Sequence, residues 1–147
     1  MEKLLIRNNL PHVVTVFSEG SYEELHTGEP NTSELIEGLK ELHSIGITVL
    51  DIKYGISAEG TTKISSPDTF GTKDQEAPNT RYNLPEDDIV PFKSDMWCLG
   101  CVITGKNVPR RYTKSQEVLD LYSDTFGPHK AQVLKSLLVL DPENRRL

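Results

Sequence analysis

Apolar residues recur at intervals of three or four positions in three stretches of the chain, which is the spacing of one face of an α-helix. The stripes are Leu35, Ile36, Leu39 and Leu42; Val118, Leu119 and Leu121; and Ala131, Val133, Leu134, Leu137 and Leu138. Thr32 or Ser33 is expected to cap the first helix, Gly46 to end it, and Ser115 to cap the second. Residues 96–103 are apolar on every side, which predicts a fully buried helix.

Strands are predicted near the beginning of the chain. Residues 3–7 and 13–17 are short apolar runs, and residues 8–12 between them contain asparagine and proline, which favour turns. We therefore expect a β-hairpin followed by a mainly helical region, an α+β fold. Residues 68–80 are polar and rich in turn formers, which indicates a surface loop.

Composition narrows the functional classes. The chain has 147 residues, 36% of them apolar, which suits one compact soluble domain. A formal net charge of −6 argues against nucleic acid as a partner, because phosphates select basic surfaces. No apolar run is long enough to span a bilayer, and residues 1–7 do not form the apolar core of a secretory signal. We expect a cytoplasmic protein, with the nucleus as the alternative.

Few side chains suggest chemistry when taken singly. Cys98 and Cys101 form a C-x-x-C motif, but it lies inside the apolar helix and has no second ligand pair, so both are expected in the core. His43 comes at the predicted end of a helix, where a structural role is expected. Arg110, Arg111 and Lys114 are interpreted as a solvated basic loop in preference to a phosphopeptide site.

Residues 42–53, LHSIGITVLDIK, resemble the catalytic loop of eukaryotic protein kinases, which runs from L-H-x-x-G-I into H-R-D-x-K-x-x-N. Val49 and Leu50 stand at the His and Arg positions of that motif. Asp51 matches the Asp that accepts the proton of the substrate hydroxyl, and Lys53 matches the Lys that neutralises phosphate charge in Ser/Thr-type kinases. The resemblance implies that only half of the charged loop is kept.

The magnesium ligands of the family have no counterparts in this sequence. Without gaps, Ile56 stands at the position of the metal-binding Asn; alternatively, about three residues are deleted after the loop. Residues 60–68 resemble the hairpin that leads to Asp-Phe-Gly, which places Ser66 at the position of the metal-binding Asp. A hydroxyl is a poor substitute for a carboxylate at magnesium. We expect no metal site, with Asp68 in a shifted register as a remote alternative.

Other motifs of the family follow in the same order along residues 13–147. Residues 81–86 resemble the end of the activation loop, residues 94–101 the helix that begins S-D-V-W-S-L-G-C, and residues 137–145 the L-L-x-x-D-P-x-x-R segment. The resemblance implies an ion pair between Glu86 and Arg145, and an Asp95 carboxylate that accepts N–H bonds from the catalytic loop. It also implies that the backbone of Val16, Phe17 and Ser18 faces an adenine ring.

The resemblance implies a kinase-like large lobe at residues 21–147, with residues 1–20 as a small-lobe hairpin and hinge, in one compact domain overall. No glycine-rich loop or phosphate-binding Lys precedes the hairpin, so we expect either a truncated relative or a fragment of a longer kinase. The expected function is that of a pseudokinase, a regulator or scaffold that binds a protein such as an active kinase or its substrate. No cofactor is expected.

Two alternatives remain open. One is a weakly active Ser/Thr kinase that uses Asp51 and Lys53 and binds Mg-ATP with low affinity. The other is a non-functional fragment. A positioned base contributes only about 10² to 10⁴ to a rate, so Asp51 alone cannot compensate for missing metal ligands.

Overall fold

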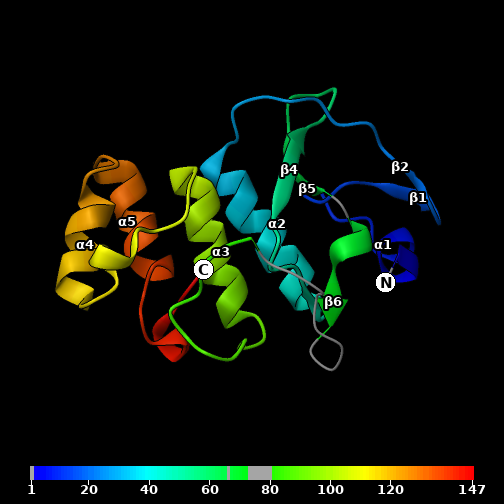
Figure 1. The fold of residues 1–147 in the computed structure, drawn as a ribbon. Helices are drawn as coiled ribbons and strands as arrows, with labels where there is room; N and C mark the ends of the chain where they lie inside the picture. Colours follow the sequence, from blue (N-terminus) through cyan, green and yellow to red (C-terminus); the bar gives the residue numbers. More distant parts are fainter. Residues whose placement is uncertain (1, 66, 73–80) are drawn as a thin grey trace. The chain divides into compact units, whose positions relative to one another are not determined.

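A computed structural model describes residues 2–65, 67–72 and 81–147. The chain divides into two compact units, residues 1–79 and 80–147. The fold is α+β, with small antiparallel sheets (Figure 1). The boundary that the sequence suggested near residue 20 falls inside the first unit, and the division into a hinge and a large lobe stays a prediction.

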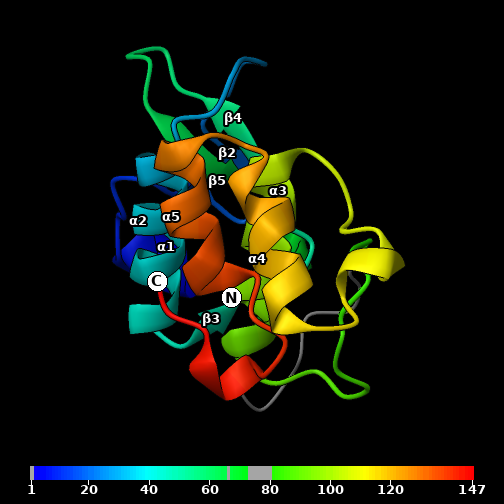
Figure 2. The same cartoon turned by 90° about the vertical axis from the view of Figure 1, so that its left-hand side faces the viewer.

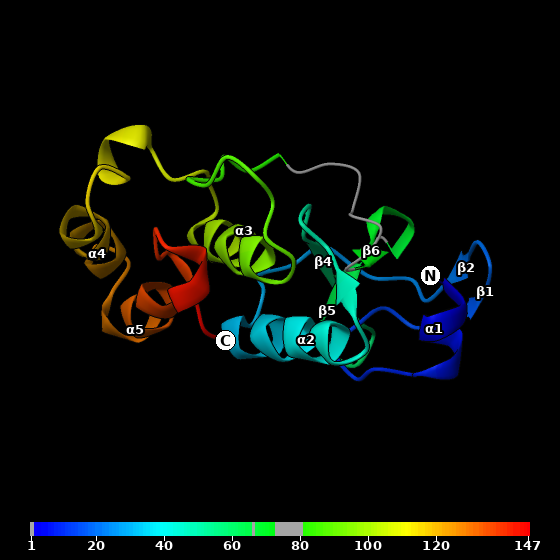
Figure 3. The same ribbon diagram turned by 90° about the horizontal axis from the view of Figure 1, so that it is seen from below.

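The first unit, unit 1, combines two α-helices with three two-stranded sheets. Its helices are α1 (Glu2–Arg7) and α2 (Thr32–Ser44), and its 3₁₀ turn is η1 (Pro67–Thr69). Its antiparallel strand pairs are β1 (Val16–Ser18) with β2 (Ser21–Tyr22), β3 (Ile47–Thr48) with β6 (Gly71–Thr72), and β4 (Lys53–Ile56) with β5 (Thr62–Ser65). Helix α2 packs beside β5, and α1 beside β1 (Figure 3).

Both edges of the β4–β5 hairpin carry a further backbone contact. Val13 bridges to Ile64 of β5, and His26 bridges to Ile56 of β4, where the two peptide N–H groups donate across the pair at 2.7 Å each. An added Cβ at Gly55 would lie 2.5 Å from Cβ of Leu25, so glycine permits this close approach. The segment around His26 is thereby fixed against the hairpin.

The second unit, unit 2, is helical. It contains α3 (Lys93–Thr104), η2 (Arg110–Tyr112), α4 (Gln116–Asp124), α5 (Pro128–Leu137) and η3 (Pro142–Asn144). Helix α5 packs against both α3 and α4 (Figure 2). All residues of α3 from Ser94 to Ile103 are buried, as its apolar sequence predicts. Cys98 and Cys101 are buried free thiols within it, and burial raises the pKa of Cys101 to about 12.

The long periodic helices are confirmed, with one change of cap. Ser115 caps α4 through a bond from the Val118 N–H, and α2 ends before Gly46, whose φ is 80°. The cap of α2 is Asn31, whose side chain accepts the Glu34 N–H at 3.0 Å; the prediction of Thr32 or Ser33 is wrong by one or two residues. Asn31 takes this role because its backbone is extended while Thr32 is already helical.

The strand expected at residues 3–7 is wrong, because these residues belong to helix α1. The run is short, and a short apolar run has no periodicity that separates a strand from a helix. Its Glu, Lys, Leu and Arg residues are good helix formers, and only Leu5 is buried. The hairpin forms instead between β1 and β2, and it turns at Gly20, whose φ is 78°.

None of the helices in the described part of the chain is both long and apolar enough to cross a bilayer. Within residues 68–80, the described part contains most of η1 and all of β6, while residues 73–80 lie outside the described residues.

Candidate functional site

Asp51 and Lys53 lie together where the chain passes from β3 to β4. The Lys53 Nζ is 3.8 Å from Asp51 Oδ2, and the two side chains are 45% and 19% exposed respectively. The preceding Leu50 has φ 57° although it is not glycine and is only 2% exposed. A buried leucine in the left-handed region is strained, and such strain is typical of tightly determined loops. The loop thus presents a carboxylate beside an ammonium group.

Of the residues matched to metal-ligand positions, Ile56 and Asp68 are described by the structure. Ile56 belongs to β4, where its side chain packs over Gly28. Asp68 is an exposed residue of η1, and Ser66 lies outside the described residues. Within the described ranges, no three His, Cys, Asp or Glu side chains gather so that they could hold a metal ion.

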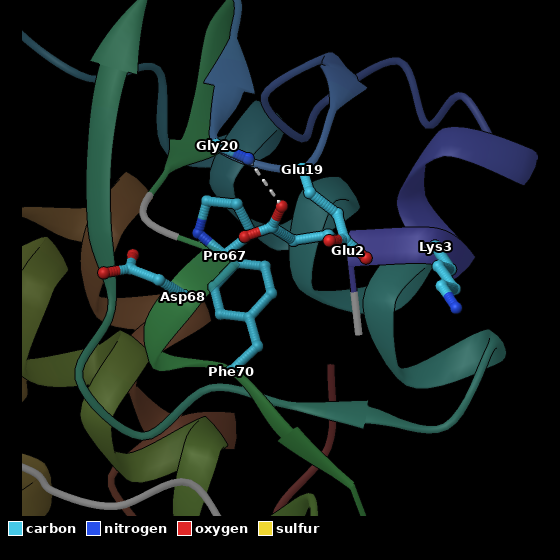
Figure 4. Close-up of a pocket in the computed structure, with 7 residues that line it drawn as sticks. All are labelled: Glu2, Lys3, Glu19, Gly20, Pro67, Asp68 and Phe70. Atoms are coloured by element: carbon cyan, nitrogen blue, oxygen red, sulfur yellow. Dashed lines mark hydrogen bonds between the residues drawn. The ribbon is translucent and has the colours of Figure 1, made fainter.

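Two surface hollows lie in unit 1. The first, the tyrosine hollow, has a volume of about 430 Å³ and is lined by Val14, Tyr22, Glu23, Leu25, His26, Thr27, Tyr54, Gly55, Ser65 and Asp68. The second, the acidic hollow, has a volume of about 530 Å³ and is lined by Glu2, Lys3, Glu19, Gly20, Pro67, Asp68 and Phe70 (Figure 4). Asp68 lines both. Volumes of this size suit small ligands or single side chains of a partner.

Among the described site residues that the sequence predicted, only Asp68, the remote alternative metal ligand, lines the hollows. Of the described residues, Asp51 and Lys53 line neither hollow, and neither do Val16, Phe17 and Ser18. Val16 is buried, whereas Phe17 is 64% exposed on β1. The adenine-facing role of these three residues stays a prediction.

A partly buried ion pair supports one wall of the tyrosine hollow. Glu23 Oε1 accepts hydrogen bonds from Lys63 Nζ at 2.7 Å and from the Thr15 N–H at 2.9 Å. The two charged side chains are only 15% and 13% exposed. Burial alone would raise the pKa of Glu23, but the bonds from Lys63 and Thr15 lower it below its ordinary value. The charge of Lys63 is therefore neutralised by Glu23.

A second polar contact joins the N-terminal helix to the β1–β2 turn. Glu2 accepts the Tyr22 O–H at 2.5 Å through one carboxylate oxygen and the Gly20 N–H at 2.9 Å through the other. The bond to Glu2, aided by burial, raises the pKa of Tyr22 to about 12. The same bond, with that of Gly20, lowers the pKa of Glu2. This contact lies at the border between the two hollows.

Glu86 and Arg145 form the ion pair that the resemblance implies, inside unit 2. Arg145 is fully buried and donates to both carboxylate oxygens of Glu86 at 2.8 Å. It also donates to the carbonyls of Lys93 and Val139, and it lies over the ring of Trp97. Burial favours the neutral acid, but the bonds from Arg145 lower the pKa of Glu86 overall. This contact fixes the fold of unit 2.

Asp95 is fully buried in the first turn of α3. The predicted bonds from the catalytic loop to Asp95 would join the two units, and they stay a prediction. Acidic side chains in a first helical turn are favoured by the helix dipole, which gives this residue a local structural role as well.

Sequence reasoning missed both hollows. Their walls come from segments that are distant in sequence, such as Tyr22 with Tyr54 and Glu2 with Phe70. No local spacing marks such residues. The charge pair between Glu23 and Lys63, separated by 40 positions, is equally invisible to a pattern.

No protein-family model matches the sequence, and no curated protein matches it either. The kinase family therefore remains a resemblance that the sequence motifs carry.

Proposed function

We propose that the chain is a catalytically impaired protein-kinase-like domain that acts by binding another protein as a regulator or scaffold. The observation that carries the proposal is the loop that keeps Asp51 beside Lys53 while Ile56 and Ser66 stand at the two metal-ligand positions. A base and an ammonium are kept, but the groups that would hold magnesium against phosphates are not.

Three structural features support a kinase-like scaffold. The hairpin of β4 and β5 follows the loop, as the matching segments imply. Helix α3 is buried along its length, and Glu86 pairs with Arg145 across 59 positions. Each feature involves a motif of the resemblance, and each is independent of catalytic chemistry.

Energetics favour impairment over weak activity. Phosphoryl transfer depends mainly on positioning and charge neutralisation, and each ~1.4 kcal/mol lost from transition-state stabilisation slows the reaction tenfold. Loss of both metal ligands is expected to slow the reaction by several such factors of ten. Asp51, even when well placed as a general base, accelerates the reaction only about 10²- to 10⁴-fold.

Exposed apolar groups in unit 1 support a protein partner. Phe17 on β1 is 64% exposed and Ile6 on α1 is 42% exposed, and these two elements pack against each other. Isolated apolar residues are common on surfaces, whereas an exposed apolar patch favours an interface. The partner that we propose is an active kinase or one of its substrates.

Phosphotransfer provides the first test. The purified chain is incubated with labelled ATP, magnesium and a general protein substrate, beside Asp51→Asn. We expect incorporation no greater than that of the variant, and no rise in melting temperature with millimolar Mg-ATP, because a ligand that binds only the folded state must stabilise it. Transfer that disappears in Asp51→Asn would establish the alternative, a weakly active Ser/Thr kinase.

Partner capture provides the second test. We expect Phe17→Ser to lose proteins that the unmodified chain captures, whereas Leu121→Ser keeps them. Leu121 is a matched control because it is 62% exposed but lies on α4 in unit 2. Equal capture by all three chains contradicts a binding role for the β1 surface.

A further inference from the structure

We propose that the tyrosine hollow receives an arginine side chain from a basic segment of a protein partner. This inference rests on the proposed binding function and specifies the chemistry of the partner. The kinase resemblance gives a role to only one residue of this surface, Asp68, as the remote alternative metal ligand.

The lining of the tyrosine hollow disfavours an anionic ligand. Among the described residues, no lysine or arginine lines it. Lys63, which lies behind the lining residue Glu23, is held by that residue at 2.7 Å and is only 13% exposed. A phosphate or carboxylate in this hollow would face Asp68 without a counter-charge, which is unfavourable.

The same lining suits a guanidinium group. Tyr22 and Tyr54 provide aromatic surface, and Asp68 provides an exposed carboxylate. A guanidinium stacks on aromatic rings and donates paired hydrogen bonds to carboxylates, whereas a lysine ammonium is a compact charge that stacks less well. The hollow is therefore better matched to arginine than to lysine.

The walls are fixed before any ligand arrives. His26 is held to Ile56 by two backbone hydrogen bonds, and Tyr22 is held by its bond to Glu2. Glu23 is held by Lys63 and Thr15. A ligand that enters such a preformed site loses less free energy to the ordering of protein groups.

A peptide is favoured over a free small cation by the adjoining acidic hollow. The acidic hollow shares Asp68 with the tyrosine hollow. It is also lined by Glu2 and Glu19, and Lys3 is the single basic residue among its described lining residues. Figure 4 shows Glu2 between Pro67 and Lys3, with the carboxylate of Asp68 on the opposite side of Pro67. A second basic residue of an extended segment would be accommodated there, and the net charge of the whole chain, −6, favours the approach of a basic partner.

The test uses a short fluorescent peptide with two arginines in a glycine background, and the same peptide with citrulline in place of arginine. Citrulline keeps the shape of arginine but carries no charge. We expect anisotropy to show binding of the arginine peptide and at least about tenfold weaker binding of the citrulline peptide. Equal binding of the two peptides overturns the proposal.

Variants then locate the site. Asp68→Asn is expected to weaken binding about three- to tenfold, and Tyr54→Leu about threefold. Glu117→Gln removes the same charge from an exposed position of α4 and is expected to leave affinity unchanged. If Asp68→Asn and Glu117→Gln weaken binding equally, the attraction is general acidity and the proposal fails.

Phosphotransfer is measured on the same preparations. Transfer together with site-specific peptide binding would overturn the proposed function but keep the arginine site. Absence of both transfer and binding would remove the arginine site and leave the proposed function standing.

Discussion

The two units use polar contacts in different ways. In unit 2, one ion pair is largely buried: Arg145 has no exposed surface and bonds to four oxygen atoms. In unit 1, the polar contacts are partly exposed and join loops to neighbouring elements: Glu2 with Tyr22, His12 with Glu41, and Glu23 with Lys63.

The difference indicates a division of roles. A buried charge is costly unless all its bonds are made, so the ion pair of unit 2 restricts that unit to one packing arrangement. The contacts of unit 1 place loops around two hollows instead of filling a core. Unit 2 is thus expected to respond strongly to loss of one group, and unit 1 to respond in several smaller steps.

Removal of Arg145 should have the largest effect. Arg145→Met leaves Glu86 without its counter-charge and two carbonyls without their donor, and we expect a loss of about 3–5 kcal/mol in the free energy of unfolding of unit 2. Trp97, the only tryptophan in the chain, is buried in that unit and donates to the Asn83 carbonyl, so its fluorescence reports the transition. Urea titration measures the change.

The double variant Glu86→Leu with Arg145→Met is the control. It removes both charges, and we expect it to recover a large part of the lost stability, because an apolar pair can replace a buried ion pair at little cost. If the double variant is as unstable as Arg145→Met alone, the unpaired charge of Glu86 is not the cause.

Alanine substitutions at two helical glycines allow a direct comparison of the packing of the two units. An added Cβ at Gly38 of α2 would lie 2.6 Å from the His12 carbonyl oxygen, whereas one at Gly100 of α3 would lie 2.5 Å from Leu138 Cδ2. A backbone oxygen cannot rotate away, but a side-chain methyl can. Overpacking destabilises a protein by about 1–3 kcal/mol, whereas replacing a helical glycine by alanine stabilises the helix by ~1 kcal/mol through its higher helix propensity. We expect Gly38→Ala to destabilise unit 1 more than Gly100→Ala destabilises unit 2.

Amide hydrogen exchange resolves the two units separately and provides the measurement. Exchange should accelerate in α2 and β5 for Gly38→Ala, because Ile64 of β5 lies 3.1 Å from the added carbon. Equal acceleration around both glycines would show that the His12 segment moves as readily as the Leu138 side chain.

The helices illustrate what periodicity can predict. Helices α2, α4 and α5 each run for at least nine residues, so their apolar stripes repeat often enough to identify them. The six residues of α1 contain too few repeats, and the strand prediction there was wrong. Asn31 was missed as a cap because three successive polar residues compete, and only the backbone conformation decides between them.

The candidate site was less predictable. Asp51 and Lys53 are two positions apart and were found in one motif, and Glu86 with Arg145 were related only through the family resemblance. The two hollows depend on which loops meet in space, and nothing in the order of residues specifies that. The exposed arrangement of Tyr54 and Asp68 was therefore visible only in the structure.

Within unit 1, substitutions of Glu41 and Glu37, which lie on the same helix, compare a structural contact with an exposed ion pair. Glu41 accepts the His12 N–H at 2.8 Å and lies 2.6 Å from the His12 ring Nδ1, whereas Glu37 lies 3.6 Å from Lys40, with both of their side chains about half exposed. We expect Glu41→Ala to cost about 1–2 kcal/mol because the backbone donor loses its acceptor, and Glu37→Ala almost nothing. Circular dichroism during thermal unfolding compares them; equal melting temperatures would contradict a role for Glu41.

The smallest expected effect is a shift in a tyrosine titration. The folded-state pKa of Tyr22 is raised from 10.0 to about 12 by its bond to Glu2. The stabilising contribution of this bond is therefore complete below the pKa of the unfolded chain and is lost as the pH rises through about 12. Ultraviolet absorbance of tyrosinate measures the titration as the difference between the unmodified chain and Tyr22→Phe. Glu2→Gln removes the charge that holds the phenol proton. The same difference, measured between Glu2→Gln and the double variant with Tyr22→Phe, should therefore show the pKa of Tyr22 moving back toward 10.0. An unchanged titration curve would mean that Glu2 does not bind Tyr22 in solution.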